Sequence, residues 1–114
     1  MRYLLLIYES ETHAEPPSAD ELRRWFDYTD RLKASECYLA GEALQPTATA
    51  TTVRGNGTKV LNTDGPFAET REQLGGFYMV DCADLDEAMR WASEMPHIHR
   101  GSVEVRPVME FEGS

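Results

Sequence analysis

The sequence predicts an α+β fold of the ferredoxin-like type, a split βαβ arrangement with two helices on one face of an antiparallel sheet. Three observations support this fold class. Two capping signals each begin a stretch with helical periodicity, apolar segments precede and follow each helix, and a glycine-containing turn separates two further strands. The chain has 114 residues, and we expect residues 1–114 to form a single domain.

Both helices are predicted from their N-termini. A capping box at residues 18–21 begins the first helix, which should run to about Ser35. Its predicted apolar face comprises Leu22, Trp25, Phe26, Thr29 and Leu32. Asp84 is the expected N-cap of the second helix, which Pro96 ends. Its predicted apolar side comprises Leu85, Ala88, Met89, Ala92 and Met95, with Trp91 beside them. We therefore expect Trp25, Phe26 and Trp91 in the core.

The predicted strands differ in how their faces are covered. Residues 3–8 and 77–80 are apolar on both faces, so both sides of these strands should be buried. The other predicted strands span residues 38–44, 49–54, 58–62 and 102–108. Gly55-Asn56-Gly57 is the expected hairpin turn between residues 49–54 and 58–62.

An apolar second face of the sheet predicts a homodimer. Two helices cover one face only, yet residues 3–8 and 77–80 would place apolar side chains on the other face as well. A large exposed apolar surface marks an interaction site. A second copy of the same sheet buries identical patches at once, so it is the simplest partner.

The charge balance excludes several classes of partner. Twenty acidic against eleven basic residues give a net charge of −9, which repels nucleic acid and anionic lipid. The apolar run after Met1-Arg2 has only six residues, too few for a signal peptide or a membrane span. We expect a cytoplasmic protein that binds neither nucleic acid nor membrane.

The cysteines and histidines do not show metal-ligand spacing. Cys37 and Cys82 are far apart in the chain and should be buried, reduced thiols. His97 and His99 lack a third ligand nearby, so surface or loop-packing roles are favoured over a metal site. His13 lies in a polar segment and should be solvated. The sequence therefore predicts no metal and no cofactor, and metal binding through His97 and His99 is the least favoured hypothesis.

The most informative segment, residues 63–77, fits no simple periodic pattern. Pro66 fixes its own φ and should hold Gly65 extended, so the backbone is expected to be stiff and turned. Asp64 stands at the entrance of this turn, and Glu69 and Arg71 follow it. Rigid backbone that presents charges is typical of a binding loop, and many structural turns share these features. Both interpretations remain open.

This segment also carries a family resemblance. Asp64-Gly65-Pro66-Phe67-Ala68-Glu69 and Glu72-Gln73-Leu74-Gly75-Gly76-Phe77 resemble the signature of the DGPF-domain proteins, a branch of the YCII-related family. Further similar segments are Gly41-Glu42-Ala43-Leu44, residues 49–54, Trp91-Ala92 and residues 101–107. The resemblance extends from Tyr3 to Pro107 and implies a ferredoxin-like fold that pairs into a dimeric α+β barrel. It leaves the activity open.

Some members of the wider family have a His–Asp pair, with the histidine on the first helix, that is suspected of acid–base work. The first predicted helix of this chain contains no histidine. A general base must therefore be sought at Asp64 or Glu69, and such a carboxylate needs a raised pKa to act near neutrality.

Charged residues also mark the last predicted strand. Glu104 and Arg106 alternate with Val103 and Val105, so they should point away from the helices into the space between two sheets. Such charges either pair with each other or form the polar floor of a small-molecule pocket. In the second case the Asp64 loop is the rim.

Two hypotheses for the function follow. The first is a dimer that binds a small organic molecule near the Asp64-Gly65-Pro66-Phe67 loop, with carboxylate acid–base chemistry. Its expected site comprises Asp64 as base or anchor, Phe67 as a packing wall, Glu69, Glu104, and Arg71 and Arg106 as anion partners. The alternative is a non-enzymatic accessory or regulatory protein whose acidic surface contacts another protein. DGPF-type proteins are similar to proteins encoded beside sigma-factor genes, which favours this alternative.

Overall fold

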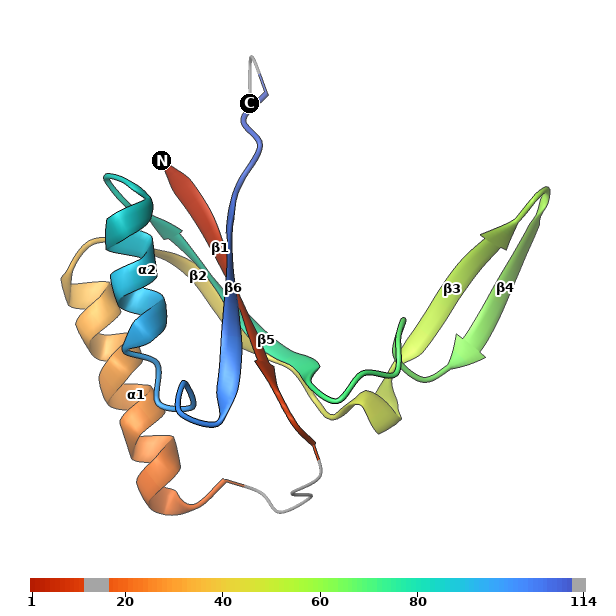
Figure 1. The fold of residues 1–114 in the computed structure, drawn as a ribbon, viewed down its shortest axis with the longest axis horizontal. Coiled ribbons are helices and arrows are strands. Elements are labelled where there is room, and N and C mark those ends of the chain that lie inside the picture. Colours follow the sequence, from red (N-terminus) through yellow and green to blue (C-terminus); the bar gives the residue numbers. More distant parts are fainter. Residues whose placement is uncertain (12–16, 112–114) are drawn as a thin grey trace.

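A four-stranded antiparallel sheet with two helices against one face forms the body of the protein (Figure 1). The computed structural model describes residues 1–11 and 17–111; His13, which we expected to be solvated, lies outside them. The elements are β1 (Arg2–Glu9), α1 (Ala19–Ala34), β2 (Tyr38–Ala43), the 3-10 helix η1 (Thr47–Thr49), β3 (Thr51–Asn56), β4 (Lys59–Asp64), β5 (Gln73–Asp81), α2 (Leu85–Ser93) and β6 (Gly101–Pro107). The sheet order is β2-β5-β1-β6. The predicted α+β fold class is confirmed.

Both predicted helix starts are confirmed. The Ser18 hydroxyl accepts a hydrogen bond from the Glu21 N–H at 3.1 Å, and the Asp84 carboxylate accepts one from the Glu87 N–H at 2.9 Å. Each cap satisfies an N–H that the first turn leaves without a partner.

The buried faces of the helices are rotated from the predicted ones. Tyr28 is fully buried in α1, whereas Phe26 is 66% exposed, so the expectation that Phe26 lies in the core was wrong. Tyr28 can face the core because its hydroxyl donates a hydrogen bond to the Trp91 carbonyl at 2.8 Å, which satisfies the polar end of a large apolar ring. Leu22, Leu85 and Met89, which we also expected on the apolar faces, are exposed.

The strands in the second half of the chain are also displaced from their predicted bounds. β5 starts at Gln73 instead of residue 77, because Gln73 and Leu74 pair with Glu9 and Tyr8 of β1. Further along the strand, Gly76 lets the β2 backbone approach closely. A Cβ at Gly76 would lie 2.9 Å from the Glu42 carbonyl oxygen. In the hairpin, Asn56 pairs with Lys59, so the turn is Gly57-Thr58 and not the predicted Gly55-Asn56-Gly57. Gly57 supplies the positive φ of 64° that such a turn needs.

The sheet surface opposite the helices, which we name the open face, mixes apolar and charged side chains. In the register of the sheet, Leu6 lies between Phe77 of β5 and Glu104 of β6. The neighbouring rows are Met79–Leu4–Arg106 and Leu74–Tyr8–Ser102. Val103 and Val105 pack toward the core, so the predicted direction of Glu104 and Arg106 is confirmed. The apolar side chains of the two central strands on this face stay partly exposed in the single chain.

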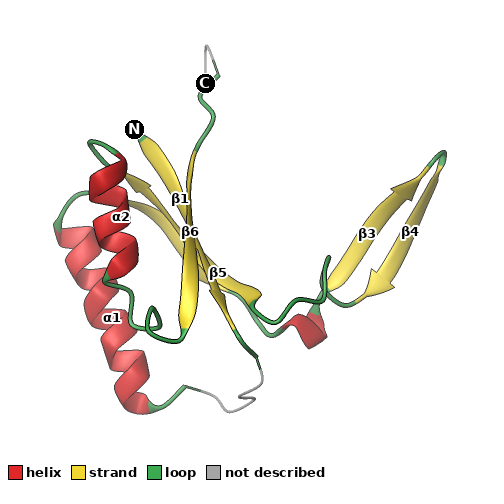
Figure 2. Ribbon diagram, in the orientation of Figure 1, coloured by secondary structure: helices red, strands yellow, loops and turns green. Residues whose placement is uncertain are grey.

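The β3–β4 hairpin projects from the body and gives the molecule extents of 46 × 44 × 17 Å (Figure 2). Its side chains are almost all exposed, among them Val53, Val60 and Leu61. Within residues 1–11 and 17–111, no helix is long and apolar enough to cross a membrane.

Candidate functional site

An open groove of about 760 Å³ runs beside the end of β1 and the start of β6. The segment that precedes β5 forms its other wall. The lining residues are Tyr8, Ser10, Thr70, Arg71, Glu72, Arg100, Ser102, Val103 and Glu104. Tyr8, Ser102 and Glu104 belong to the open face, so the groove continues that surface at one end of the sheet.

Hydrogen bonds fix the wall that precedes β5. The side-chain Nε2 of Gln73 donates to the carbonyls of Ala68 and Thr70, each at 3.1 Å. The Thr70 hydroxyl donates to the Glu72 carbonyl. Across the groove, the Ser102 hydroxyl donates to the Glu72 carboxylate at 3.0 and 3.3 Å. These bonds tie the segment to both β5 and β6, so the groove has a defined shape.

The charges of the groove are only partly compensated. Arg100 pairs with Glu9 at 3.2 Å and with Glu21. Arg71 has no hydrogen bond or ion pair with any residue that the structure describes, although it lines the groove. The groove thus contains a guanidinium without a partner among the described residues together with the carboxylates of Glu72 and Glu104, a set that can bind a ligand with both anionic and hydrogen-bonding groups.

Glu104 and Arg106 form the pair that was one of the two alternatives for the last strand. The Arg106 Nε donates to Glu104 Oε2 at 2.7 Å, and both side chains keep substantial exposure. A solvent-exposed pair of this kind contributes little to stability. Glu104 also lines the groove, so its pairing with Arg106 does not withdraw it from this surface.

The Asp64 loop lies at the base of the hairpin. Asp64 ends β4 opposite Thr51, and its exposed carboxylate accepts no hydrogen bond from the described part of the chain. Gly65 has a φ of 115°, a glycine conformation, and not the extended one that we predicted. Its N–H donates to the Ala50 carbonyl at 2.7 Å, and its carbonyl accepts from the Thr52 hydroxyl at 2.7 Å. The turn is therefore held by the Ala50 carbonyl and the Thr52 hydroxyl, and not by the Asp64 side chain.

Phe67 and Glu69 follow this turn and are both exposed. The Arg54 guanidinium lies 5.1 Å from the centre of the Phe67 ring and donates to the Phe67 carbonyl at 2.6 Å. Within the described residues, the groove brings together Arg71 and Glu104 of the expected site. It does not include Asp64, Phe67, Glu69 or Arg106.

Sequence reasoning missed several residues of the groove. Ser102 shares the strand face of Glu104 and Arg106, so the alternation along β6 could have identified it. Glu72 lies within residues 63–77, but no feature of the sequence distinguished it from Glu69 as a candidate site residue. Tyr8 and Arg100 come to the groove only through the β1–β6 pairing, which sequence periodicity does not reveal.

His97 lies between the start of β6, which lines the groove, and Trp25 of α1. It is fully buried, its Nε2 lies 3.0 Å from the Ser102 carbonyl oxygen, and its ring stacks on Trp25 with centroids 5.5 Å apart. The predicted loop-packing role of His97 is confirmed, and His99 is on the surface. The buried ring fixes the backbone at the start of β6, where Ser102 faces the groove.

The fold and groove define an α+β sheet protein with an open face and a polar site at one end of it. The family model described as the YCII-related domain matches residues 1–112, and the chain belongs to that family. It is 41% identical over 118 residues to an uncharacterized protein of Rhizobium meliloti (strain 1021), covering 98% of this chain and 95% of the relative.

A solved structure with a similar fold is the 5-chloro-2-hydroxyhydroquinone dehydrochlorinase of Burkholderia phenoliruptrix AC1100, in complex with 2,5-dihydroxybenzoquinone. The TM-score is 0.54 at 17% identity, and the match covers 98% of this chain and 97% of that chain. At this identity the likeness concerns the fold alone.

Proposed function

We propose that the protein is a homodimer that binds a small organic anion in the groove beside its open face. The observation that carries the proposal is this face itself, where Leu6 and Phe77 of the central strands are partly exposed in the single chain. A second copy would bury the same patch on both chains at once. The groove would then lie at the rim of the interface, where the partner would restrict its access to water.

The chemistry of the groove supports an anionic ligand of small size. The free guanidinium of Arg71 can bind a carboxylate, a phenolate or an enolate through two parallel hydrogen bonds. Tyr8 and Val103 provide apolar surface for a ring or a short chain. The volume of about 760 Å³ is in the range of small-molecule sites. The dehydrochlorinase of similar fold was solved with an oxygen-rich ring compound, which agrees with a ligand of this size.

A finer proposal is that a carboxylate exchanges a proton with the bound molecule. Glu72 and Glu104 line the groove, and Asp64 and Glu69 lie on the loop that leads from the hairpin toward it. Asp64 remains the candidate base from the sequence, and the loop of a partner chain is one way to bring it to a groove. Burial against a partner is the physical route by which the pKa of a carboxylate rises toward neutrality.

The dimer is tested by placing a charge on the open face. Wild-type protein should have twice the chain mass of 12.9 kDa in light scattering at micromolar concentration. Leu6→Glu adds a carboxylate in the row that already holds Glu104, so we expect a folded monomer. Met89→Glu is the control, because Met89 is exposed on α2 in the helix layer. A wild-type monomer, or a Leu6→Glu dimer, would refute the proposal.

Ligand binding is tested on Arg71. Native mass spectrometry would first search for a small molecule that co-purifies, and a thermal-shift screen would use a panel of aromatic and aliphatic carboxylates. Arg71→Gln should abolish the stabilisation by the hits and leave the melting temperature of the free protein unchanged. Arg23→Gln, which removes an exposed arginine of α1, should bind like the wild type. Equal binding by both variants would exclude the groove as the anion site.

The accessory-protein alternative is favoured by one separate observation. The projecting hairpin exposes Val53, Val60 and Leu61, with exposed fractions of 63%, 70% and 49%. Exposed apolar side chains on an acidic protein are consistent with a protein partner. If Val53→Ser with Val60→Ser removes a partner that cross-links to the hairpin while Arg71→Gln does not, the accessory role is the better assignment.

A further inference from the structure

The two cysteines meet at the end of the sheet that is remote from the groove. Cys37 immediately precedes β2, and Cys82 immediately follows β5. These strands are antiparallel neighbours, and the Asp81 N–H donates to the Cys37 carbonyl at 2.8 Å. Pairing of β2 with β5 therefore brings together two thiols that the sequence separates by more than forty positions.

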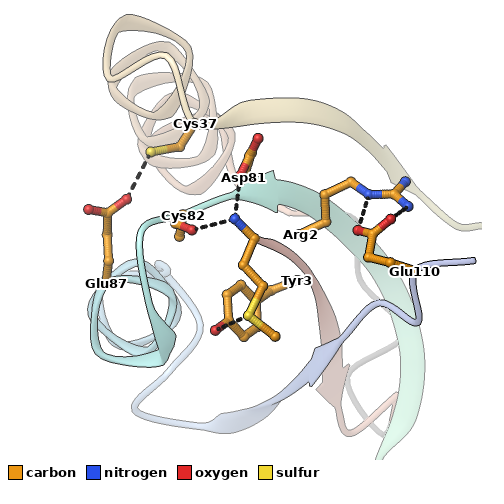
Figure 3. Close-up of polar contacts among 8 residues, drawn as sticks. Arg2, Tyr3, Cys37, Asp81, Cys82, Glu87 and Glu110 are labelled. Carbon is orange, nitrogen blue, oxygen red and sulfur yellow. Dashed lines mark hydrogen bonds and ion pairs between the residues drawn. The ribbon is translucent and has the colours of Figure 1, made fainter. Parts of the chain in front are cut away.

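An acidic side chain completes this cluster. Glu87 lies in the first turn of α2, whose start is fixed by the Asp84 cap. Cys37 Sγ lies 3.2 Å from Glu87 Oε1, and the two side chains point toward each other in Figure 3. Both sulfur atoms and a carboxylate oxygen of Glu87 lie within 4.8 Å of one another. Cys82 is 2% exposed, whereas Cys37 is only half-buried.

The three side chains converge in the metal-free protein. The Cys37 thiol donates a hydrogen bond to Glu87 at 3.2 Å, and the Cys82 sulfur lies within 4.8 Å of both partners. Three groups that can each carry a negative charge thus share one small space. A cation at the centre would bind all three groups and displace the thiol protons.

We propose that Cys37, Cys82 and Glu87 bind one zinc ion. Two thiolates with one carboxylate are a ligand set that suits Zn²⁺, and ligand atoms this close can share one ion. Binding forms two Zn–S bonds and one Zn–O bond, and it releases the two thiol protons to solvent. Three protein ligands leave one coordination position, which water can fill from the half-exposed side of Cys37.

The ion would add a link between α2 and two strands that are already paired with each other. It would link the start of β2, the end of β5 and the first turn of α2, so it would clamp the helix layer to one edge of the sheet. The groove lies near Tyr8, whereas the Met1 ammonium at the other end of β1 donates to the Cys82 carbonyl at 2.9 Å. The zinc site is therefore separate from the proposed ligand site, and each can fail independently of the other.

The experiment is a zinc titration of the chelator-treated full chain, kept reduced with a phosphine. Wild-type protein should bind one ion per chain in native mass spectrometry, release two protons per ion and melt at a higher temperature with zinc. Glu87→Gln and Cys37→Ser should each weaken zinc binding at least about tenfold, since even the loss of an outer-shell partner costs that much. Asp86→Asn is the matched control, because it removes the same charge from the same helical turn outside the cluster.

A second measurement distinguishes the loss of the metal site from the misfolding of a variant. Cobalt bound by wild type should give a thiolate charge-transfer band in the near ultraviolet, which Cys37→Ser should reduce and Asp86→Asn should retain. Circular dichroism would verify that each variant is folded. The proposal is overturned if wild type binds no zinc, if Glu87→Gln and Asp86→Asn bind it equally, or if the cobalt complex lacks the thiolate band.

Discussion

Gly101→Ala tests the packing of β6 against the central strand. A Cβ at this position would lie 2.5 Å from the Tyr8 carbonyl oxygen and 2.6 Å from Cδ2 of His97. The Tyr8 oxygen belongs to the backbone of β1, and His97 is held by Trp25 and by the Ser102 carbonyl. Neither neighbour can therefore move away without the loss of contacts that stabilise the fold. The φ of Gly101 is not in the left-handed region, so the overlap alone determines the cost.

Such overpacking costs about 1–3 kcal/mol of unfolding free energy. For a domain of this length, about 1 kcal/mol corresponds to a shift of about 4 °C in melting temperature. We therefore expect a decrease of about 4–12 °C in thermal unfolding followed by circular dichroism, at one fixed protein concentration.

Gly75→Ala is the control, because no atom lies within 4 Å of a Cβ at that position. It should melt at or slightly above the wild-type temperature, since alanine restricts the unfolded chain. If Gly101→Ala melts together with Gly75→Ala, the close approach of β6 to Tyr8 and His97 is wrong.

Three further predictions concern stability. Tyr28→Phe should lower the unfolding free energy by about 1 kcal/mol in urea denaturation, because it removes the bond to the Trp91 carbonyl; no loss would mean that this bond contributes nothing. Burial raises the pKa of Cys82 from 9.0 to about 12 and raises the pKa of Tyr28 and Tyr78 above 10.0, so the unfolded chain loses these protons first. The unfolding free energy of reduced, metal-free protein should therefore fall as the pH rises from about 9 toward 12, and a constant urea midpoint would contradict this. Asp64→Asn should change stability by less than about 0.5 kcal/mol, because its exposed carboxylate holds no backbone group of its turn; a loss of about 1–3 kcal/mol would show a structural role instead.

The helices could be predicted because their signals are local. Ser18 and Asp84 each bond to an N–H three residues ahead, and helical periodicity extends over a few turns. The rotation of α1 about its axis could not be predicted in the same way. Phe26 is the more apolar residue, but Tyr28 is buried, because Trp91 of the other helix offers a carbonyl to its hydroxyl.

The Asp64 segment shows a different limit of sequence reasoning. Gly65 and Pro66 indicated a bend in the chain, which the structure has, but Gly65 adopts a φ of 115° and not the extended conformation that we predicted. Where this turn lies relative to the groove depends on the direction of the projecting hairpin. No local rule fixes that direction. Sequence reasoning therefore placed Asp64 in one site with Arg71 and Glu104, whereas only Arg71 and Glu104 of these three line the groove.

The sequence by itself determined the fold class and the two-sided character of the sheet, because alternation and periodicity are properties of neighbouring residues. The tertiary structure decided which distant side chains share a site. Glu72 meets Ser102, and Cys37 meets Cys82, through the order and register of the strands. Strand order is set by the packing of the whole domain, so a contact between residues 30 or more positions apart becomes visible only in the folded chain.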